Sequence, residues 1–293
     1  MPRVRVTSVI RGAVRLMRPR QWIKNVLVAA APLAAGTLLE GSTLVRTALA
    51  FVAFCLASSA TYCVNDVMDA ASDARHPTKR HRPVASGAIS PRTALVLAAV
   101  LAAAALAITG PLEFRLVVLG YLVVTVSYSV WLKHQPVLEL GLVSAGFLLR
   151  AVGGGVATGL PLSQWFLIVT AFGSLFMVTG KRLSELTNAT GASEVVRRSL
   201  TAYPLSYLRS VLGVSAAVTI TGYCLWAFEV GARHTGGAWS AVSVAPFVLA
   251  LLRYSLDSDL GKVEEPEEVV RRDRTLQVLG ALWLGCFAMG VLL

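Results

Sequence analysis

Apolar residues along the chain gather in long runs that short charged segments separate. A run of about 20 apolar residues is what an α-helix needs to cross the hydrocarbon core of a bilayer. The pattern predicts nine such spans, with boundaries good to a few residues: Trp22–Leu39, Leu44–Val64, Thr93–Thr109, Leu116–Leu132, Val137–Thr158, Trp165–Thr179, Leu208–Phe228, Ser240–Leu256 and Thr275–Leu293. The expected fold class is therefore an all-α integral membrane bundle of nine transmembrane helices.

The composition agrees with this pattern. Hydrophobic residues make up 55% of the 293 positions, and the mean hydropathy is +0.66. An ordinary soluble domain is less apolar. The lipid bilayer is therefore the expected environment of most of the chain.

The charges divide unevenly between the two sides of the predicted bundle. With the N-terminus in the cytoplasm, all but four of the 27 Lys and Arg residues fall on the cytoplasmic side. Arg46, Arg115 and Arg233 lie in outer loops, and Arg150 lies within a span. Such a bias is typical of multi-pass proteins of the cell (inner) membrane. We therefore expect an odd number of spans, a cytoplasmic N-terminus and an active-site cavity on the cytoplasmic side.

The net charge of +11 reflects this basic cytoplasmic face. Such a face suits anionic lipid headgroups and phosphorylated ligands. Because the cations border membrane helices, no nucleic-acid partner is expected. A homo-oligomer stays open.

The predicted organisation is one transmembrane domain, 21–293, after a basic segment, 1–20, with the pattern of an amphipathic helix lying on the membrane surface. The long cytoplasmic loops are expected at 65–91, 180–207 and 257–274. Loops carry functional groups on a rigid scaffold, so the chemistry is expected there.

Three aspartates follow the second predicted span in the pattern N-D-x-x-D-x-x-x-D. Asn65 and Asp66 begin the motif, and Asp69 and Asp73 complete it. If the helix continues, the three carboxylates share one face and repel one another. A divalent cation would relieve this repulsion, and an oxygen-only ligand set suits Mg²⁺. We expect the aspartates to be the catalytic carboxylates and, with Asn65, the metal ligands.

A dense basic run comes directly after the aspartates. Lys79, Arg80 and Arg82 are candidates to bind phosphate groups, although they could also only anchor the topology. Carboxylates for a metal beside cations for anions indicate a metal-diphosphate site at the membrane surface.

Further candidates for substrate binding lie on other segments. Cations could bind phosphate oxygens beside the acid in Gly180-Lys181-Arg182-Leu183-Ser184-Glu185, although a positive anchor with a surface ion pair is an equal alternative. A charge at the depth of Arg150 usually faces a polar cavity, where it could bind an anion, although structural pairing with an unidentified carboxylate is the alternative. The three glycines after it allow close packing or local unwinding. Lys24 and Asn25, just inside the first span, could reach the same cavity as Arg150, and Tyr128 is the remaining candidate.

At this point the residues resemble a family. Nine helices, the aspartate motif after the second span and a charged motif after the sixth are similar to the UbiA superfamily of intramembrane prenyltransferases. The resemblance covers essentially the whole chain. It implies a UbiA-like bundle in which Mg²⁺ on two aspartate-rich motifs binds a polyprenyl diphosphate. Here the second motif is Lys181-Arg182-x-x-Glu185, which departs from that pattern.

Several segments resemble one branch, the decaprenyl-phosphate phosphoribosyltransferases of mycobacterial-type cell-wall synthesis. They are Arg18–Asn25, His76–Pro83, Tyr128–Lys133, Gly146–Ala151 and Gly180–Glu185. The branch implies transfer of 5-phosphoribose from phosphoribosyl diphosphate (PRPP) to a polyprenyl phosphate such as decaprenyl phosphate. The product would be a precursor of the arabinose donor for cell-wall arabinan.

Two other functions stay open at this stage. A Mg²⁺-dependent prenyltransferase with an isoprenoid diphosphate and an aromatic or other acceptor would need carboxylates near the sixth span, where Glu185 is the candidate. A transporter would need polar residues near the midplane and an inverted repeat. Apart from Arg150 the spans are poor in such residues, so the enzyme is favoured.

Overall fold

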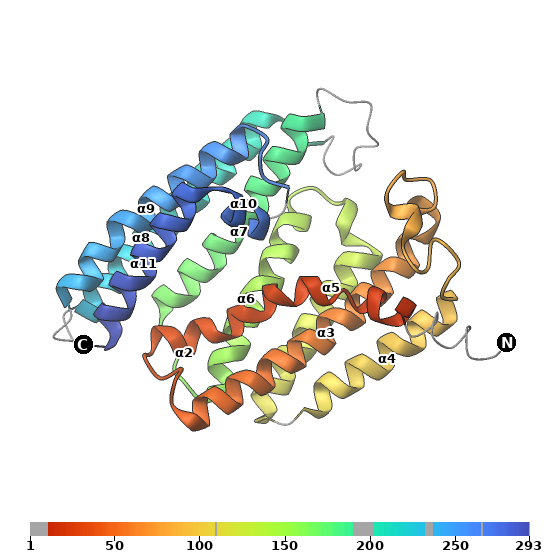
Figure 1. The fold of residues 1–293 in the computed structure, drawn as a ribbon, viewed down its shortest axis with the longest axis horizontal. Helices are drawn as coiled ribbons and strands as arrows, with labels where there is room; N and C mark the ends of the chain where they lie inside the picture. Colours follow the sequence, from red (N-terminus) through yellow and green to blue (C-terminus); the bar gives the residue numbers. More distant parts are fainter. Residues whose placement is uncertain (1–10, 109, 190–201, 232–236, 265, 293) are drawn as a thin grey trace. The chain divides into compact units, whose positions relative to one another are not determined.

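The computed structural model describes residues 11–108, 110–189, 202–231, 237–264 and 266–292, and the elements in them are helices (Figure 1). Parts of three predicted regions lie outside the described residues, namely the N-terminal segment 1–20 and the loops 180–207 and 257–274. The elements are η1 (Pro19–Ala29), α2 (Ala30–Ala34), α3 (Gly41–Asp73), η2 (Lys79–His81), α4 (Pro91–Ala107), α5 (Leu112–Val130), η3 (Leu132–His134), α6 (Leu138–Thr158), α7 (Gln164–Ala189), α8 (Leu205–Gly231), α9 (Gly237–Asp259), α10 (Pro266–Arg272) and α11 (Arg274–Leu292).

Seven of these helices are long and apolar enough to cross a membrane, namely α3, α5, α6, α7, α8, α9 and α11. Helix α4 is apolar but has 17 residues. The first predicted span, Trp22–Leu39, is instead a 3₁₀ run, η1, followed by the short α2. The count of nine transmembrane helices therefore stays a prediction.

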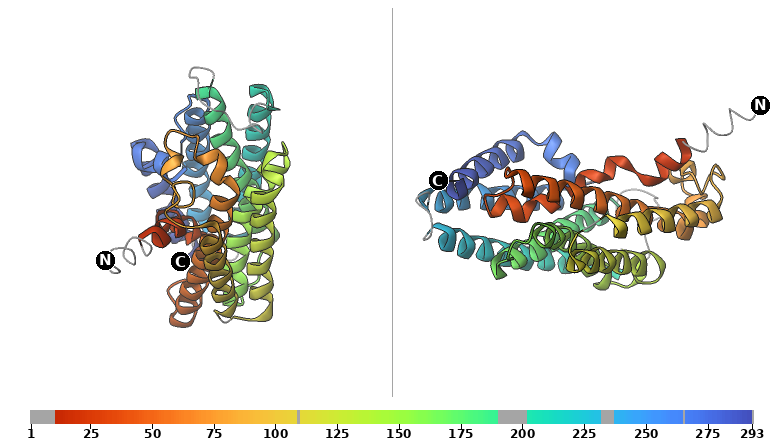
Figure 2. Two further views of the ribbon diagram at one scale, coloured as in Figure 1. Left: turned by 90° about the vertical axis from the view of Figure 1, so that its right-hand side faces the viewer. Right: turned by 90° about the horizontal axis from the view of Figure 1, so that it is seen from below.

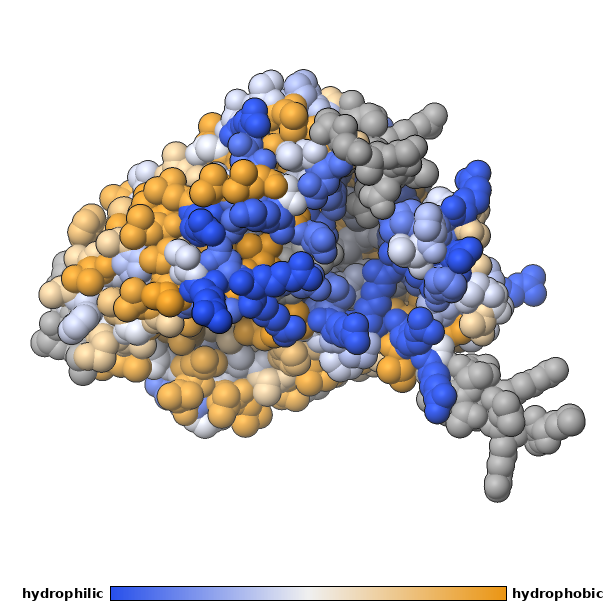
Figure 3. All heavy atoms as spheres, turned by 45° about the horizontal axis from the view of Figure 1, so that its top comes forward, coloured by the Kyte–Doolittle hydropathy of each residue, from blue (hydrophilic) through white to orange (hydrophobic). Residues whose placement is uncertain are grey.

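Large hydrophobic side chains lie on the outside of the helices. Leu249 on α9 and Val278 and Leu282 on α11 are each more than half exposed. Figure 3 shows hydrophobic residues covering much of the left-hand part of that view. Water would not favour such a surface, but lipid tails match it.

The chain forms two compact units. Unit 1 comprises 1–32, 38–133 and 149–161, and unit 2 comprises 33–37, 134–148 and 162–293. In unit 1, η1, α4 and α5 pack on α3 (Figures 1 and 2). In unit 2, α8 packs between α7 and α9, and α11 packs on α9. Two compact units can lie within one domain, so the predicted single domain stays a prediction.

Glycines on α6 let η1 approach closely within unit 1. A Cβ on Gly154 would lie 1.8 Å from the Val28 carbonyl oxygen, and one on Gly153 would meet the Phe54 ring at 2.5 Å. Helix α6 continues without interruption through these residues. Of the two roles predicted for the glycines, the structure thus supports close packing and not unwinding.

Both predicted charged motifs lie within helices, so the predicted ends of the second and sixth spans are corrected. Helix α3 runs past the predicted end at Val64 to Asp73, and α7 runs past Thr179 to Ala189. Neither extension contains a glycine or proline beyond Gly180, so nothing in the sequence ends the helix at the membrane boundary. The predicted loops 65–91 and 180–207 therefore begin as helix, which fixes the spacing of their side chains.

Candidate active site

The three aspartates line the last turns of α3 in unit 1. Because the helix reaches Asp73, the spacings of three and four residues place Asp66, Asp69 and Asp73 along one face. Asp66 and Asp73 are buried, and Asp69 is half-buried. This confirms the predicted helical stripe of carboxylates.

Each carboxylate is paired with a cation from a different segment. Arg18 donates a hydrogen bond to Asp66, and Lys133 donates one to Asp69. The Arg82 Nη1 atom lies 2.6 Å from Asp73 Oδ2 and 3.7 Å from Asp66 Oδ1. Three positive side chains thus compensate three negative ones, which explains how the stripe persists without mutual repulsion.

The amide of Asn65 belongs to the same cluster. Its Nδ2 donates to Asp69 Oδ2 at 3.1 Å, from the preceding turn of α3. The amide oxygen is a potential metal ligand of the same hard kind as the carboxylates.

Arg18 reaches Asp66 from an unusual backbone conformation. Its φ of +51° lies in the left-handed region, at the junction between the helical residues 11–17 and η1. Its guanidinium also lies over the Tyr62 ring, 5.0 Å from the centroid. Non-glycine residues adopt such angles at a cost of about 1–3 kcal/mol, and they cluster at functional sites.

Three other predicted cations of unit 1 lie on two short elements. Lys79 and Arg80 belong to η2, where the Arg80 Nε donates to His81 Nε2 at 3.4 Å. Lys24 lies on η1 and is half-buried. Tyr128 is half-buried in the last turn of α5, five residues before Lys133. Of the basic run, Arg82 contacts the carboxylates.

Arg150 is buried in unit 1 and is held by neutral groups from two other elements. Its Nε donates to Asn25 Oδ1 at 2.7 Å, and its Nη2 donates to the Tyr121 hydroxyl at 2.8 Å. The guanidinium also lies 4.7 Å from the centroid of the Tyr121 ring. The structure therefore joins Arg150 with Asn25, which the sequence predicted, and adds Tyr121. Its role toward a substrate stays a prediction.

The charged motif on α7 forms a separate cluster in unit 2. The Arg182 Nε and Nη2 atoms each lie 3.0 Å from a carboxylate oxygen of Glu139 on α6. Its Nη1 lies 2.7 Å from Glu185 Oε2, and the Lys181 Nζ lies 4.0 Å from Glu185 Oε1. The Arg182 and Glu139 side chains are only 7% and 1% exposed. Arg182 is thus a buried, bidentate partner of a carboxylate, and its contact with a phosphate stays a prediction.

The predicted loop 257–274 contains a structural cap. Asp273 accepts hydrogen bonds from the backbone N–H groups of Thr275 and Leu276, at the start of α11, and from Arg253. Burial alone would raise the pKa of Asp273, but the hydrogen bonds from Arg253 and Leu276 outweigh it and hold that pKa at about 2. This carboxylate therefore stabilises the helix start as an anion.

Sequence reasoning did not single out several residues of these clusters. Arg18 and Lys133 lie 48 and 64 positions from their aspartates, so spacing alone could not connect them. Glu139 and Tyr121 stand in apolar runs of α6 and α5. A buried ionisable residue in a membrane helix requires a polar or charged partner. That rule, applied to Arg150 and Glu139, was the available signal that other side chains must contact these two residues.

The donor set on α3 fits a hard divalent cation in its chemistry. Three carboxylates and one amide on one helix face supply oxygen ligands without nitrogen or sulfur. Among the described residues, no three His, Cys, Asp or Glu side chains converge on one point as a closed ligand set would. A metal at this face would exchange with the cations of Arg18, Arg82 and Lys133 for the carboxylate oxygens.

Known proteins are similar to nearly the full length of the chain. The model of the UbiA prenyltransferase family matches residues 26–272. A decaprenyl-phosphate phosphoribosyltransferase of Mycobacterium tuberculosis is 46% identical over 293 residues, which cover 97% of this chain and 95% of that protein. One of Corynebacterium glutamicum is 43% identical, over 96% of this chain and 86% of that protein.

A solved structure has the same fold. It is a UbiA homologue from Archaeoglobus fulgidus bound to DMAPP and Mg²⁺, which covers 95% of this chain and 98% of its own, with a TM-score of 0.69 at 16% identity. Together with the apolar helices, this fold makes the chain a multi-pass membrane protein. By the family match and the identity to its relatives, the chain is a member of the UbiA prenyltransferase family.

Proposed function

We propose that this protein is a decaprenyl-phosphate phosphoribosyltransferase. It transfers 5-phosphoribose from PRPP to a polyprenyl phosphate, decaprenyl phosphate in particular, and releases diphosphate. The identity of 46% with the Mycobacterium tuberculosis enzyme, over nearly all of both chains, carries this conclusion. The product is a precursor for the arabinose of cell-wall arabinan.

Mg²⁺ is the cofactor in this proposal. Asp66, Asp69 and Asp73 would hold it, with Asn65 assisting, since these side chains give one face of oxygen donors. When bound, the metal neutralises charge on the diphosphate as the bond to the ribose breaks. The Archaeoglobus fulgidus homologue with DMAPP and Mg²⁺ supports a divalent metal in this fold.

The cations around the aspartates have a second task in this proposal. Arg18, Arg82 and Lys133 neutralise the carboxylates in the free protein, and their side chains keep 16–26% of their surface exposed. With the carboxylates holding a divalent cation, these side chains would be available for phosphate oxygens of PRPP. The binding of metal and of diphosphate would thereby be coupled. The metal needs the carboxylates that Arg18, Arg82 and Lys133 contact in the free protein, and the diphosphate needs those three cations.

The reaction itself needs little proton transfer. The C1–O bond to diphosphate breaks and a C1–O bond to the lipid phosphate forms, while the bonding pair leaves with diphosphate. The attacking phosphate is already an anion, so it needs positioning and a water-poor setting more than a general base. Lys79 and Arg80 are further candidates to orient the donor's phosphates.

In unit 2, Lys181 is a better candidate for a phosphate contact than Arg182. The guanidinium of Arg182 is engaged by both oxygens of Glu139 and by Glu185. Lys181 lies at the edge of that cluster, half-buried and 4.0 Å from Glu185. Arg182 would then act as a positioning residue for Glu185 and, through Glu185, for Lys181.

The orientation follows from the charge distribution and the donor. PRPP is a water-soluble metabolite, and the aspartates lie at the membrane end that carries the greater part of the Lys and Arg residues. The proposed location is the cell (inner) membrane, with the N-terminus and the active site on the cytoplasmic side.

One experiment tests this function. Purified protein in detergent is incubated with Mg²⁺, radiolabelled PRPP and decaprenyl phosphate, and the lipid is extracted into organic solvent. Label is expected in the lipid phase, and EDTA or the substitution Asp66→Ala should remove it. Asp259→Ala is the matched control, because Asp259 forms an exposed ion pair with Arg209 on unit 2.

The alternative, an isoprenoid-diphosphate prenyltransferase, has support from the DMAPP-bound homologue. The same preparation is therefore offered a labelled isoprenoid diphosphate with a panel of aromatic acceptors. Prenyl transfer without phosphoribosyl transfer would overturn the proposed function. The proposal expects the reverse result.

A further inference from the structure

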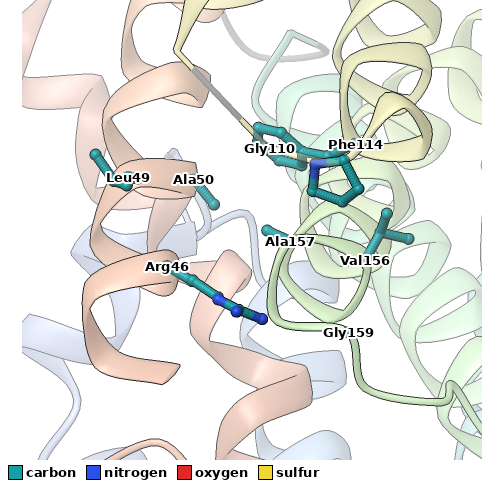
Figure 4. Close-up of a pocket in the computed structure, with 9 residues that line it drawn as sticks. Arg46, Leu49, Ala50, Gly110, Phe114, Val156, Ala157 and Gly159 are labelled. Carbon is teal, nitrogen blue, oxygen red and sulfur yellow. The ribbon is translucent and has the colours of Figure 1, made fainter. Parts of the chain in front are cut away.

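Unit 1 contains a pocket whose lining includes none of the aspartates of the candidate active site. Its volume is about 530 Å³, and it lies between α3, the start of α5 and the end of α6 (Figure 4). The Arg46 side chain points into it from α3 (Figure 4). Its other walls are small or apolar, and they include Leu49, Phe114 and Val156. Pockets of this size hold small ligands or lipid headgroups.

The pocket and the aspartates lie at opposite ends of one helix. Arg46 and Asp66 are both on α3, which is continuous from Gly41 to Asp73. Twenty residues of α-helix rise about 30 Å, which is the thickness of the hydrocarbon core. The pocket is therefore at the other membrane face from the active site.

The pocket combines one cation with apolar walls. Arg46 is exposed, and among the described residues no carboxylate pairs with it. Helix α5 begins beside it at Leu112, directly after the cap residue Pro111 that lines the pocket, and the first N–H groups of a helix have no partners within the helix. The guanidinium of Arg46 and the N-terminus of α5 both favour a negatively charged group in the pocket.

We propose that this pocket binds the phosphate headgroup of an anionic phospholipid in the leaflet opposite the active site. Arg46 contacts the phosphate, and the side chains of Leu49 and Val156 contact the upper part of an acyl chain. Soluble phosphate would leave these apolar walls against water, so a lipid satisfies both parts of the pocket. The apolar end of a polyprenyl chain would leave Arg46 without its anion.

The test measures which lipid the purified protein keeps. The protein is equilibrated with equal amounts of phosphatidylglycerol and phosphatidylcholine, and bound lipids are counted by native mass spectrometry. Wild type should prefer phosphatidylglycerol by about tenfold, because phosphatidylcholine offsets its phosphate charge with a choline cation that the Arg46 guanidinium would repel. Arg46→Gln should bring the ratio close to one. Arg115→Gln is the matched control, because Arg115 is an exposed outer arginine on α5 that does not line the pocket.

A second variant separates the pocket from the charge. Val156→Phe keeps Arg46 but fills part of the cavity, so it should also lower the retained phosphatidylglycerol. Phosphoribosyl transfer should stay unchanged in both variants, so the result does not depend on the proposed function. An equal loss in Arg46→Gln and Arg115→Gln, or no preference in wild type, would overturn the proposal. Displacement of the bound lipid by uncharged decaprenol would overturn it in favour of a polyprenyl tail.

Discussion

The two charged clusters differ in how they use the same kinds of residue. In unit 1, three carboxylates on α3 meet cations from three other segments, and those cations are 16–26% exposed. In unit 2, Arg182 meets both oxygens of Glu139 with hardly any exposed surface. The first arrangement can exchange partners with a ligand from solution. In the second, a change of Glu139 would leave the buried Arg182 guanidinium with only the half-buried Glu185 of the two carboxylates described at it.

This difference assigns different tasks to the two motifs. The aspartate cluster is suited to bind a metal and a diphosphate, whereas the Arg182–Glu139 pair ties α7 to α6 and holds Glu185 in place. Mutations should therefore separate them: substitutions in unit 1 should change catalysis and ligand binding, and substitutions in unit 2 should change stability first.

The largest expected effect is the loss of transfer in Asp66→Asn. This variant keeps the shape of the side chain but removes one negative charge from the proposed metal site. We expect the initial rate of phosphoribosyl transfer to fall by about 10³-fold, since metal stabilisation of a leaving group is worth several kcal/mol. Asp259→Asn should retain the wild-type rate. A rate within threefold of wild type for Asp66→Asn would contradict the metal assignment.

The second prediction concerns stability in unit 2. Glu139→Gln replaces the buried carboxylate of the pair with a neutral amide and leaves Arg182 with the half-buried Glu185, which should lower the free energy of unfolding by about 3 kcal/mol. The double variant Glu139→Leu/Arg182→Met removes both charges and should be more stable than Glu139→Gln. Chemical denaturation in detergent measures both. If Glu139→Gln unfolded at the same denaturant concentration as wild type, the Arg182–Glu139 ion pair would not contribute to stability.

A smaller effect is expected for the exchange of partners in unit 1. Lys133→Ala frees the Asp69 carboxylate from competition, so Mg²⁺ alone should bind about tenfold more tightly. The same variant should bind Mg²⁺ with PRPP more weakly than wild type, because a phosphate contact is lost. Calorimetric titration measures both affinities, and a parallel change in the two would be evidence against the exchange.

The smallest effect is expected at the cap of α11. Asp273→Ala should reduce stability by about 1 kcal/mol, the usual contribution of an N-cap. Since the pKa of Asp273 is lowered to about 2, its contribution is complete above the ordinary carboxyl pKa and is lost as the pH falls through 2. Thermal unfolding between pH 7 and pH 3 measures this. The unfolding temperature of Asp273→Ala should lie below that of wild type by a constant amount near neutral pH, and this gap should become smaller as the pH falls toward 3.

The sequence predicted the helical fold class and the stripe of aspartates, and it marked Arg150 as a charge that needs polar surroundings. These follow from periodicity and from the cost of charge in a membrane helix, both of which are local. It did not predict that Arg18 and Lys133 pair with the aspartates, because those contacts depend on how distant elements pack. It also missed Glu139, which converts Arg182 from a candidate phosphate ligand into one side of a buried ion pair.

The measurement that tests the central claim most directly is binding of PRPP to the purified protein, with Mg²⁺ and with EDTA. Wild type and Asp259→Asn should bind PRPP more tightly with Mg²⁺, by at least about tenfold, because the aspartate cluster binds the metal that the diphosphate requires. Asp69→Asn should lose this dependence. If Asp69→Asn kept the full Mg²⁺-dependent binding, the aspartates of α3 would not be the metal-diphosphate site.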